Sequence, residues 1–354
     1  MNMSRLAPYL GIVIGLICGI FIFTLFGHTT VVHAPVTIPT AVISAQIQTA
    51  SSTIKKIEPS SIPLKAIPVS IATALSSLEN AALDASASTL RNALVNILCY
   101  APTRSGLRSI SASGVIIDPK GIILTNAHVA QYFLLADHGV SCVIRSGSPA
   151  TNRYGAKLIY ISPRWLRTNQ TVLTETSPNG NGEYDFAFLA VSGSATTDSL
   201  PFLFPSLPLA MTSPDTKVPV IITSYGAQFL ELNHIVSELF PTIVFGSVKD
   251  VFTFGTNTID VLALGGSAAA QEGSSGGGVA DKNGELLGII TTSTISGATD
   301  TRSLSAITAS YIRSEYASET GQSLNLLLAK TPSVSINDFA PRVSELESII
   351  TAHL

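Results

Sequence analysis

The feature that most constrains the fold is a series of short apolar runs between residues 94 and 308, each bounded by turn residues. Their length and their content of Val, Ile, Leu and Thr are typical of β-strands. Because no helical segments alternate with them, we expect an all-β sandwich or pair of barrels and not a parallel sheet of βαβ units. The runs are LVNILCY, SASGVIID, GIILTN, AKLIYIS, YDFAFLAV, VPVIITSY, TIVFGSV, TIDVLAL, GVAD, LLGIITTS and SLSAIT.

Turn chemistry supports hairpins at two places in this series. Residues 118–121 (DPKG) and 281–284 (DKNG) each place a residue that tolerates positive φ between two apolar runs. Beyond the series, residues 309–321 (ASYIRSEYASETG) have helical character, SLNLLL has the pattern of a last strand, and residues 335–354 can close the chain with another helix.

Composition limits the function classes. The chain has 354 residues with 46% hydrophobic content, enough to bury a folded core. Its formal net charge is −3, and no run of Lys or Arg exceeds the pair Lys55 and Lys56, so the basic patch of a nucleic-acid-binding protein is missing. No His pair has metal-ligand spacing, and we expect no cofactor, no metal and no nucleic-acid partner.

The N-terminus indicates a membrane. Residues 10–26 (LGIVIGLICGIFIFTLF) carry no charge and are just long enough to cross a hydrocarbon core of about 30 Å as a helix. Arg5 precedes the run and the next basic residue is Lys55, so we expect a single-pass anchor with its N-terminus in the cytoplasm and the rest of the chain on the extracytoplasmic side. A cleavable signal peptide ending near Ala34 is the alternative.

The remaining chain divides by composition. After the anchor (1–27), residues 28–68 are rich in Ser, Thr and Pro and are typical of a tether. In residues 69–92, Ile71, Leu75, Leu78 and Ala82 recur at helical spacing, so we expect an amphipathic helix whose apolar face packs on the folded domain. That domain spans 93–330, and the helical tail 331–354 is too short for a PDZ-type domain.

Three segments carry residues suited to catalysis. Residues 113–130 form an apolar hairpin that ends in TNAHVA and places His128 at a strand end. Residues 184–189 (YDFAFL) hold Asp185 in an apolar strand, where a buried carboxylate needs a donor such as a His Nδ1 proton. Residues 272–278 (EGSSGGG) surround Ser275 with glycines, which allow a tight turn and converging N–H groups.

Together these segments resemble the trypsin-like serine proteases, and in particular the HtrA-like bacterial branch. The matching pieces are ILTNAHV (123–129), the D-x-A-x-L pattern at 185–189 and the G-x-S-G-G pattern at 273–277. Their order is also that of the chymotrypsin class. The resemblance covers about residues 93–312 and implies two antiparallel six-stranded β-barrels with an active site in the cleft between them.

The resemblance also implies roles. Ser275 would be the nucleophile, His128 the general base and Asp185 the residue that orients the imidazole, with the backbone N–H groups of Gly273 and Ser275 as the oxyanion hole. The substrate would be a polypeptide. Ser274 is a weaker rival nucleophile because Ser275, and not Gly, follows it. The alternative reading is a catalytically degenerate domain that uses the same cleft only to bind peptide.

Two further expectations concern the pocket and the cysteines. In the trypsin-like pattern the pocket base corresponds to Ala269, and the opposite wall to residues 291–293 (Thr291, Thr292 and Ser293), which predicts small to medium aliphatic residues before the scissile bond. Cys99 and Cys142 lie in strand-like runs of the first barrel, and an exported compartment permits a disulfide between them or leaves two buried thiols.

Overall fold

A computed structural model describes residues 69–354 except 104–105, 176–179, 256–257, 294–297 and 299–300, and without the side chains of 69–75, 292 and 293. The described residues belong to one compact unit. The expected membrane-spanning run 10–26 and the tether 28–68 lie outside them. In the part of the chain that is described, no helix is long and apolar enough to cross a membrane.

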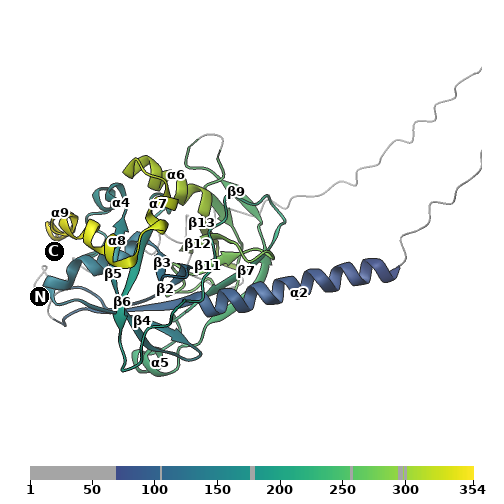
Figure 1. Cartoon of the computed structure of the whole chain (residues 1–354), viewed down its shortest axis with the longest axis horizontal. Coiled ribbons are helices and arrows are strands. Elements are labelled where there is room, and N and C mark those ends of the chain that lie inside the picture. The colour runs from purple at the N-terminus through teal and green to yellow at the C-terminus, as the bar shows by residue number, and fades with distance from the viewer. Residues whose placement is uncertain (1–68, 104–105, 176–179, 256–257, 294–297, 299–300) are drawn as a thin grey trace, which may run out of the picture. The chain divides into compact units, whose positions relative to one another are not determined.

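The first half of this unit is a closed antiparallel barrel with the strand order β1-β2-β3-β6-β5-β4 (Figure 1). A trypsin-like fold with a closed six-stranded barrel is thus present in this half. Short helices connect the strands. The strands are β1 (Leu94–Tyr100), β2 (Ile110–Asp118), β3 (Ile122–Thr125), β4 (Ser141–Gly147), β5 (Ala150–Ile161) and β6 (Ala187–Ser194), and the helices are α3 (Ala127–Ala130), η2 (Gln131–His138) and α4 (Pro163–Thr168).

The second half is a seven-stranded sheet in the order β8-β7-β11-β12-β13-β10-β9, which forms a half-barrel. Its two edge strands follow one another in the chain: Val248 pairs with Val218 beside β7, and Lys249 pairs with Ala263 beside β10. The expectation of a second six-stranded barrel is therefore confirmed in part, because one stretch bonds to both edges of the sheet but is divided into two short strands. The elements are β7 (Pro219–Ser224), α5 (Leu232–Ser237), β8 (Thr242–Ser247), β9 (Asp250–Phe252), β10 (Val261–Ala263), β11 (Gly278–Ala280), β12 (Leu286–Ser293) and β13 (Leu304–Thr308).

Both predicted hairpin turns are confirmed. Between β2 and β3, Gly121 has a φ of +89° and its N–H donates to the Asp118 carbonyl at 2.9 Å. Between β11 and β12, Gly284 has a φ of +77°, and the Asp281 carboxylate accepts the N–H groups of Asn283 and Glu285. These turns form because a glycine takes up the left-handed region and an aspartate closes the turn with its side chain.

Helix α2 (Val69–Ala93) reaches the sheets only with its C-terminal half. Figure 1 shows its N-terminal part extending away from them. Leu90 is fully buried. A Cβ atom at position 278 of β11 would lie only 2.8 Å from the Leu90 side chain, so Gly278 leaves the space that Leu90 occupies. Leu78 is 67% exposed, so the expected apolar face does not pack along its whole length.

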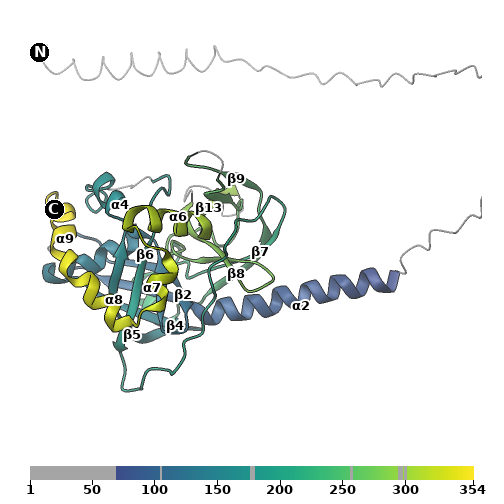
Figure 2. The ribbon, with the colours of Figure 1, turned by 45° about the horizontal axis from the view of Figure 1, so that its top comes forward.

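The C-terminal helices are α6 (Ala309–Thr320), α7 (Leu324–Ala329), α8 (Pro332–Phe339), η4 (Ala340–Arg342) and α9 (Val343–Thr351). Of these helices, α8 and α9 lie against the first barrel and its connecting helices, whereas α6 contacts β12 and β13 of the second sheet. Helix α8 lies on β5 and β6 (Figure 2), and Tyr316 of α6 packs edge-on against Tyr160 of β5 at 4.8 Å between ring centroids. The expectation that SLNLLL is a strand is wrong, because these residues form α7.

A disulfide joins two neighbouring strands of the first barrel. Cys99 of β1 and Cys142 of β4 are directly opposite one another in the antiparallel register, with their Cα atoms 4.0 Å apart. The bond covalently links β1 to β4, which are also paired by hydrogen bonds. Strand β3 of the same barrel leads into the His128 segment.

Candidate active site

His128 lies on the short helix α3, directly after strand β3. Asn126 is the N-cap of this helix, and its side-chain amide donates to the Asp185 carbonyl at 2.9 Å. The His128 side chain is 32% exposed, so its ring is accessible from solvent while its backbone is fixed. The sequence expectation of an imidazole at a strand end agrees with this placement.

Asp185 is buried and lies just before β6 begins. The His128 Nδ1 atom is 2.8 Å from Oδ2, and the His128 backbone N–H donates to Oδ1 at 2.9 Å. The Thr291 hydroxyl also donates to Oδ2, at 2.8 Å. The carboxylate therefore has the donors that a buried charge requires, and it orients the ring so that Nε2 is free to act as a base.

Ser275 lies on the Gly-rich loop before β11, where two glycines permit close backbone packing. A Cβ at Gly276 would lie 2.1 Å from the Ser113 carbonyl oxygen, and one at Gly277 would lie 2.5 Å from that of Thr223. Gly276 also has a φ of +81°, which a larger residue adopts at a cost. Ser275 itself is partly exposed.

The Ser275 loop is hydrogen-bonded to strands of both sheets, β2 of the first barrel and β12 of the second sheet. The Ser275 carbonyl accepts the Ser113 N–H at 2.8 Å, and the Gly276 N–H donates to Ile290, the residue before Thr291. In the described part of the chain no hydrogen bond joins the Ser275 hydroxyl to the His128 ring. Catalytic hydrogen bonds are often long in unliganded enzymes and tighten when substrate binds.

The Gly273 and Ser275 N–H groups are the predicted oxyanion hole. The Glu272 carbonyl accepts the Ala227 N–H at 2.7 Å, and because the peptide bond is trans, the Gly273 N–H points the opposite way. Neither Gly273 nor Ser275 donates its N–H within the described residues, whereas Ser274, Gly276 and Gly277 all do. Two unpaired N–H groups beside one hydroxyl can bind a developing oxyanion.

The remaining serines near the loop have structural contacts. Ser274 is buried, and its hydroxyl accepts a hydrogen bond from Ser224 at 3.1 Å, so it is not accessible to a substrate. The Ser113 hydroxyl donates to the Gly273 carbonyl and accepts the Tyr225 N–H, both at 2.8 Å. Ser113 of β2 thereby links the oxyanion loop to Tyr225, the residue after β7. No sequence motif identified Ser113.

Of the predicted pocket residues, Thr291 has a different position from the one expected. Its hydroxyl donates to Asp185 and its side chain is buried, so it supports the carboxylate and is not a pocket wall. Ala269 is fully buried beside Ala270, whose carbonyl accepts a hydrogen bond from Arg302 at 2.7 Å. The side chains of Thr292 and Ser293 lie outside the described residues.

Burial and Asp185 shift the pKa of His128 in opposite directions. Burial lowers the pKa of the imidazole, but the charge and hydrogen bond of Asp185 together outweigh it, so the pKa lies above its usual value of 6.5. An imidazolium formed during a reaction is therefore stabilised by Asp185.

Comparison with known families identifies the class of the domain. Residues 112–289 match the trypsin-like peptidase domain, and this range includes His128, Asp185 and Ser275. The chain belongs to the trypsin-like peptidase family, and it is a serine-type endopeptidase, a hydrolase. No curated protein matches the chain.

Among solved structures, the active form of the Rv3671c protease from M. tuberculosis is similar at 19% identity and a TM-score of 0.43, over 70% of this chain and 87% of that one. The inactive form of the same protease has 19% identity and a TM-score of 0.42, over 69% and 96%. The serine endoprotease from Yersinia pestis has 20% identity and a TM-score of 0.42, over 68% of each chain.

Proposed function

We propose that the chain cleaves peptide bonds through an acyl-enzyme formed on Ser275, with His128 as general base and Asp185 as its orienting partner. The observation that carries the proposal is the His128–Asp185 hydrogen bond of 2.8 Å beside a serine loop with two unpaired N–H groups. A non-cleaving peptide-binding domain is the second candidate.

In the first half-reaction the Ser275 Oγ attacks the scissile carbonyl carbon, and its proton passes to Nε2 of His128. The carbonyl oxygen becomes an oxyanion that accepts the Gly273 and Ser275 N–H groups. When the tetrahedral intermediate collapses, Nε2 gives the proton to the leaving amine and the acyl group stays on Oγ. In the second half-reaction His128 takes a proton from a water molecule as its oxygen attacks the ester carbonyl carbon. When this second tetrahedral intermediate collapses, the bond to Oγ breaks, Nε2 returns the proton to Oγ, and the carboxylic acid product leaves.

Peptidase turnover of two serine variants tests the assignment. Ser275→Ala removes the nucleophile and should reduce turnover to the background of uncatalysed hydrolysis, while circular dichroism shows an unchanged fold. The matched control Ser274→Ala loses only the buried hydrogen bond between the Ser224 and Ser274 hydroxyls, and its turnover should stay within about tenfold of the wild type. Full activity of Ser275→Ala would refute the role of Ser275, and inactivity of a well-folded wild type would favour the binding-only candidate.

The location is also part of the proposal. Residues 10–26 would anchor the chain in a membrane with the N-terminus in the cytoplasm and the peptidase domain outside. The Cys99–Cys142 disulfide supports an oxidising, extracytoplasmic compartment. In cells that express the full chain, an externally added protease should degrade the domain without lysis. Protection of the domain until the membrane is disrupted would contradict this orientation.

For specificity we keep the expectation of a small to medium aliphatic residue before the scissile bond. Ala269 and Ala270 are buried and bring no fixed negative charge to the pocket, and the Arg302 guanidinium next to Ala270 would repel a basic side chain. Selectivity among aliphatic residues should be modest, about 1 to 3 kcal/mol per methylene. Profiling with a peptide library is the test, and dominant cleavage after Lys or Arg would refute the pocket assignment.

A further inference from the structure

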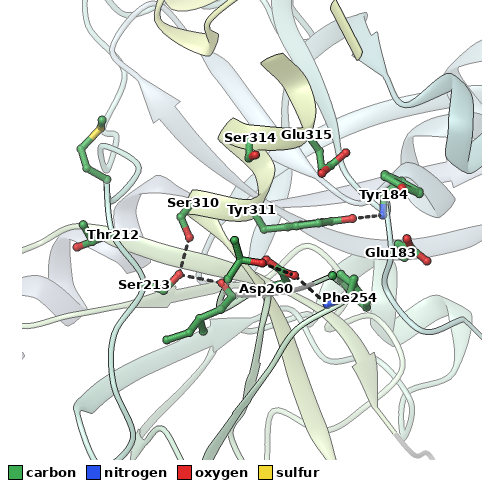
Figure 3. Close-up of a pocket in the computed structure, with 14 residues that line it drawn as sticks. Glu183, Tyr184, Thr212, Ser213, Phe254, Asp260, Ser310, Tyr311, Ser314 and Glu315 are labelled. Carbon is green, nitrogen blue, oxygen red and sulfur yellow. Dashed lines mark hydrogen bonds between the residues drawn. The ribbon is translucent and has the colours of Figure 1, made fainter. Parts of the chain in front are cut away.

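A second cavity lies beside the active site and contains none of its residues. Its volume is about 600 Å³, and it is lined by residues 183–184, 211–213, 254–255 and 258–260 and by the first turns of α6 (Figure 3). Tyr184, on its wall, directly precedes Asp185 in the sequence. The cavity is therefore a separate space that shares one wall with the catalytic carboxylate.

The charge of the lining is negative. Three carboxylates face the cavity, those of Glu183, Asp260 and Glu315, and no Lys or Arg lines it. Asp260 is committed to the turn, because its Oδ2 accepts hydrogen bonds from Thr253, Phe254 and Thr258. Glu183 is half-buried, and burial raises the pKa of Glu315, so a cation in the cavity would relieve the cost of burying the Glu315 charge.

Aromatic rings form the other part of the lining. The Tyr311 ring centroid is 5.1 Å from that of Phe254 and 6.5 Å from that of Tyr184, so three rings lie next to one another between the carboxylates. The ring faces are negative and attract a cation, and the Tyr311 hydroxyl already accepts the Tyr184 N–H. This combination selects an organic cation over a hydrated inorganic one.

At the edge of the cavity, Arg164 of the chain itself already contacts one aromatic ring and one carboxylate of the lining. The Arg164 guanidinium lies 5.3 Å from the centre of the Tyr184 ring and 3.4 Å from the Glu315 carboxylate. Arg164 is not part of the lining, which leaves the Tyr311 and Phe254 rings and Glu183 without a cation.

We propose that this cavity binds an organic cation on an alkyl stem, the ammonium or guanidinium group of a Lys or Arg side chain. The cation can come from a basic residue of the substrate itself, upstream of the scissile bond, or from a separate basic peptide. The stem would pack on Tyr311 and Phe254, and the charged head would pair with Glu183 and Glu315.

Binding there has a direct route to the catalytic residues. The Tyr184 N–H donates to the Tyr311 hydroxyl at 3.0 Å, and Tyr184 has a φ of +57°, which is rare for a residue with a side chain. A ligand held against both tyrosines would therefore stabilise the backbone that presents Asp185 to His128. This part of the inference rests on the proposed function, whereas the binding site does not.

The binding test uses the full chain with Ser275→Ala, so that no probe is cleaved. Nα-acetyl-lysine amide is titrated and followed by NMR, with Nα-acetyl-norleucine amide as a neutral probe on a similar stem. We expect the lysine amide to bind at least about tenfold more tightly and to shift signals of Tyr311 and Phe254. Equal affinity of the two amides, or shifts elsewhere only, would overturn the proposal.

Variants identify the carboxylates involved. Glu183→Gln keeps the size of the side chain and an oxygen that can accept the Asn181 amide, so the fold should stay intact. The variant should bind the lysine amide several-fold more weakly, and adding Glu315→Gln should bring the loss to about tenfold or more. The control Glu231→Gln changes an exposed glutamate outside the cavity and should bind as the parent does. Unchanged affinity in Glu183→Gln and in the double variant would refute the site.

Turnover by the active chain then distinguishes the two sources. Peptides with Lys or norleucine several residues upstream of the scissile bond are compared in wild type and Glu183→Gln. A wild-type preference for Lys that Glu183→Gln removes assigns the site to substrate, and stimulation by added lysine amide without such a preference assigns it to a separate ligand. If the chain has peptidase activity but the lysine amide does not bind to the Ser275→Ala chain, only the cavity site is overturned. If the amide binds but the wild type has no peptidase activity, only the proposed function is overturned.

Discussion

At the scale of single residues, the Ser113 hydroxyl is the contact on which the oxyanion loop depends most. It bonds the Gly273 carbonyl and the Tyr225 N–H at the same time, so Ser113→Ala leaves a buried donor and acceptor unpaired. We expect kcat to fall by about tenfold or more with little change in KM, because the Gly273 N–H would be less well placed in the transition state.

Ser111→Ala is the matched control for this prediction. Ser111 lies two residues earlier on β2, and its hydroxyl accepts a hydrogen bond from Asn96 and makes none to the oxyanion loop. Its kcat should stay close to the wild-type value. Equal effects of the two substitutions, or a rise of KM alone in Ser113→Ala, would show that Ser113 has only a structural role.

The protonation of His128 gives a second prediction at this scale. Asp185 raises the pKa of the imidazole, and only the neutral ring can act as a base, so kcat should rise with pH through a midpoint above 6.5. NMR titration in the Ser275→Ala chain measures the same group without turnover. Asp185→Asn removes the charge and should lower the His128 pKa, and an unchanged pKa would contradict the assigned pairing.

Sequence motifs reached His128, Asp185 and Ser275 because each lies in a short local pattern. The motifs did not identify Ser113, and they predicted Thr291 to be part of the pocket wall. Both residues act through contacts between segments that are far apart in the chain. A single hydroxyl in a strand has no local signal for such a contact.

At the scale of elements, helix α2 carries one buried and one exposed leucine, so the effect of packing on stability can be compared within one helix. Leu90 is fully buried against Gly278, so Leu90→Ala should lower the free energy of unfolding by about 2 to 5 kcal/mol. Leu78→Ala, at a position that is 67% exposed, should stay within about 0.5 kcal/mol of the wild type. Denaturant unfolding measures both, and equal losses would contradict the packing of α2.

The disulfide gives a second prediction for the first barrel. The double variant Cys99→Ala/Cys142→Ala frees the link between β1 and β4, and we expect the unfolding free energy to fall by about 2 to 4 kcal/mol. Thermal unfolding of the oxidised wild type and the variant measures this loss. A variant as stable as the wild type would show that the strand pairing alone holds this edge.

Elements were predictable where the signal was local. The turns at 118–121 and 281–284 followed from their Asp and Gly residues. The strand β4 was recognised only as the strand-like run around Cys142, and β9 was missed because it has only three residues. SLNLLL formed α7 because a short apolar run fits a strand and a buried helix equally well. The division of one extended stretch into β8 and β9 at 248–249 has no sequence pattern.

At the scale of the whole molecule, the active site exists only where the two sheets meet. The first barrel supplies His128 and Asp185, and the second sheet supplies Ser275 and, through β12, Thr291. The Ser113–Ser275 and Thr291–Asp185 hydrogen bonds cross this junction. The order of the three motifs could be seen in the sequence, but their meeting at the junction requires the packed fold.

The most direct test of the account is to map a covalent adduct at the proposed nucleophile. The full chain is treated with a serine-directed fluorophosphonate, digested, and analysed by mass spectrometry. We predict a single adduct on Ser275 that is lost in Ser275→Ala, retained in Ser274→Ala and greatly slowed in Asp185→Asn, because the neutral imidazole must be held for attack. An adduct on another serine, or no adduct on a well-folded wild type, would contradict the assignment of Ser275, His128 and Asp185 as the catalytic residues.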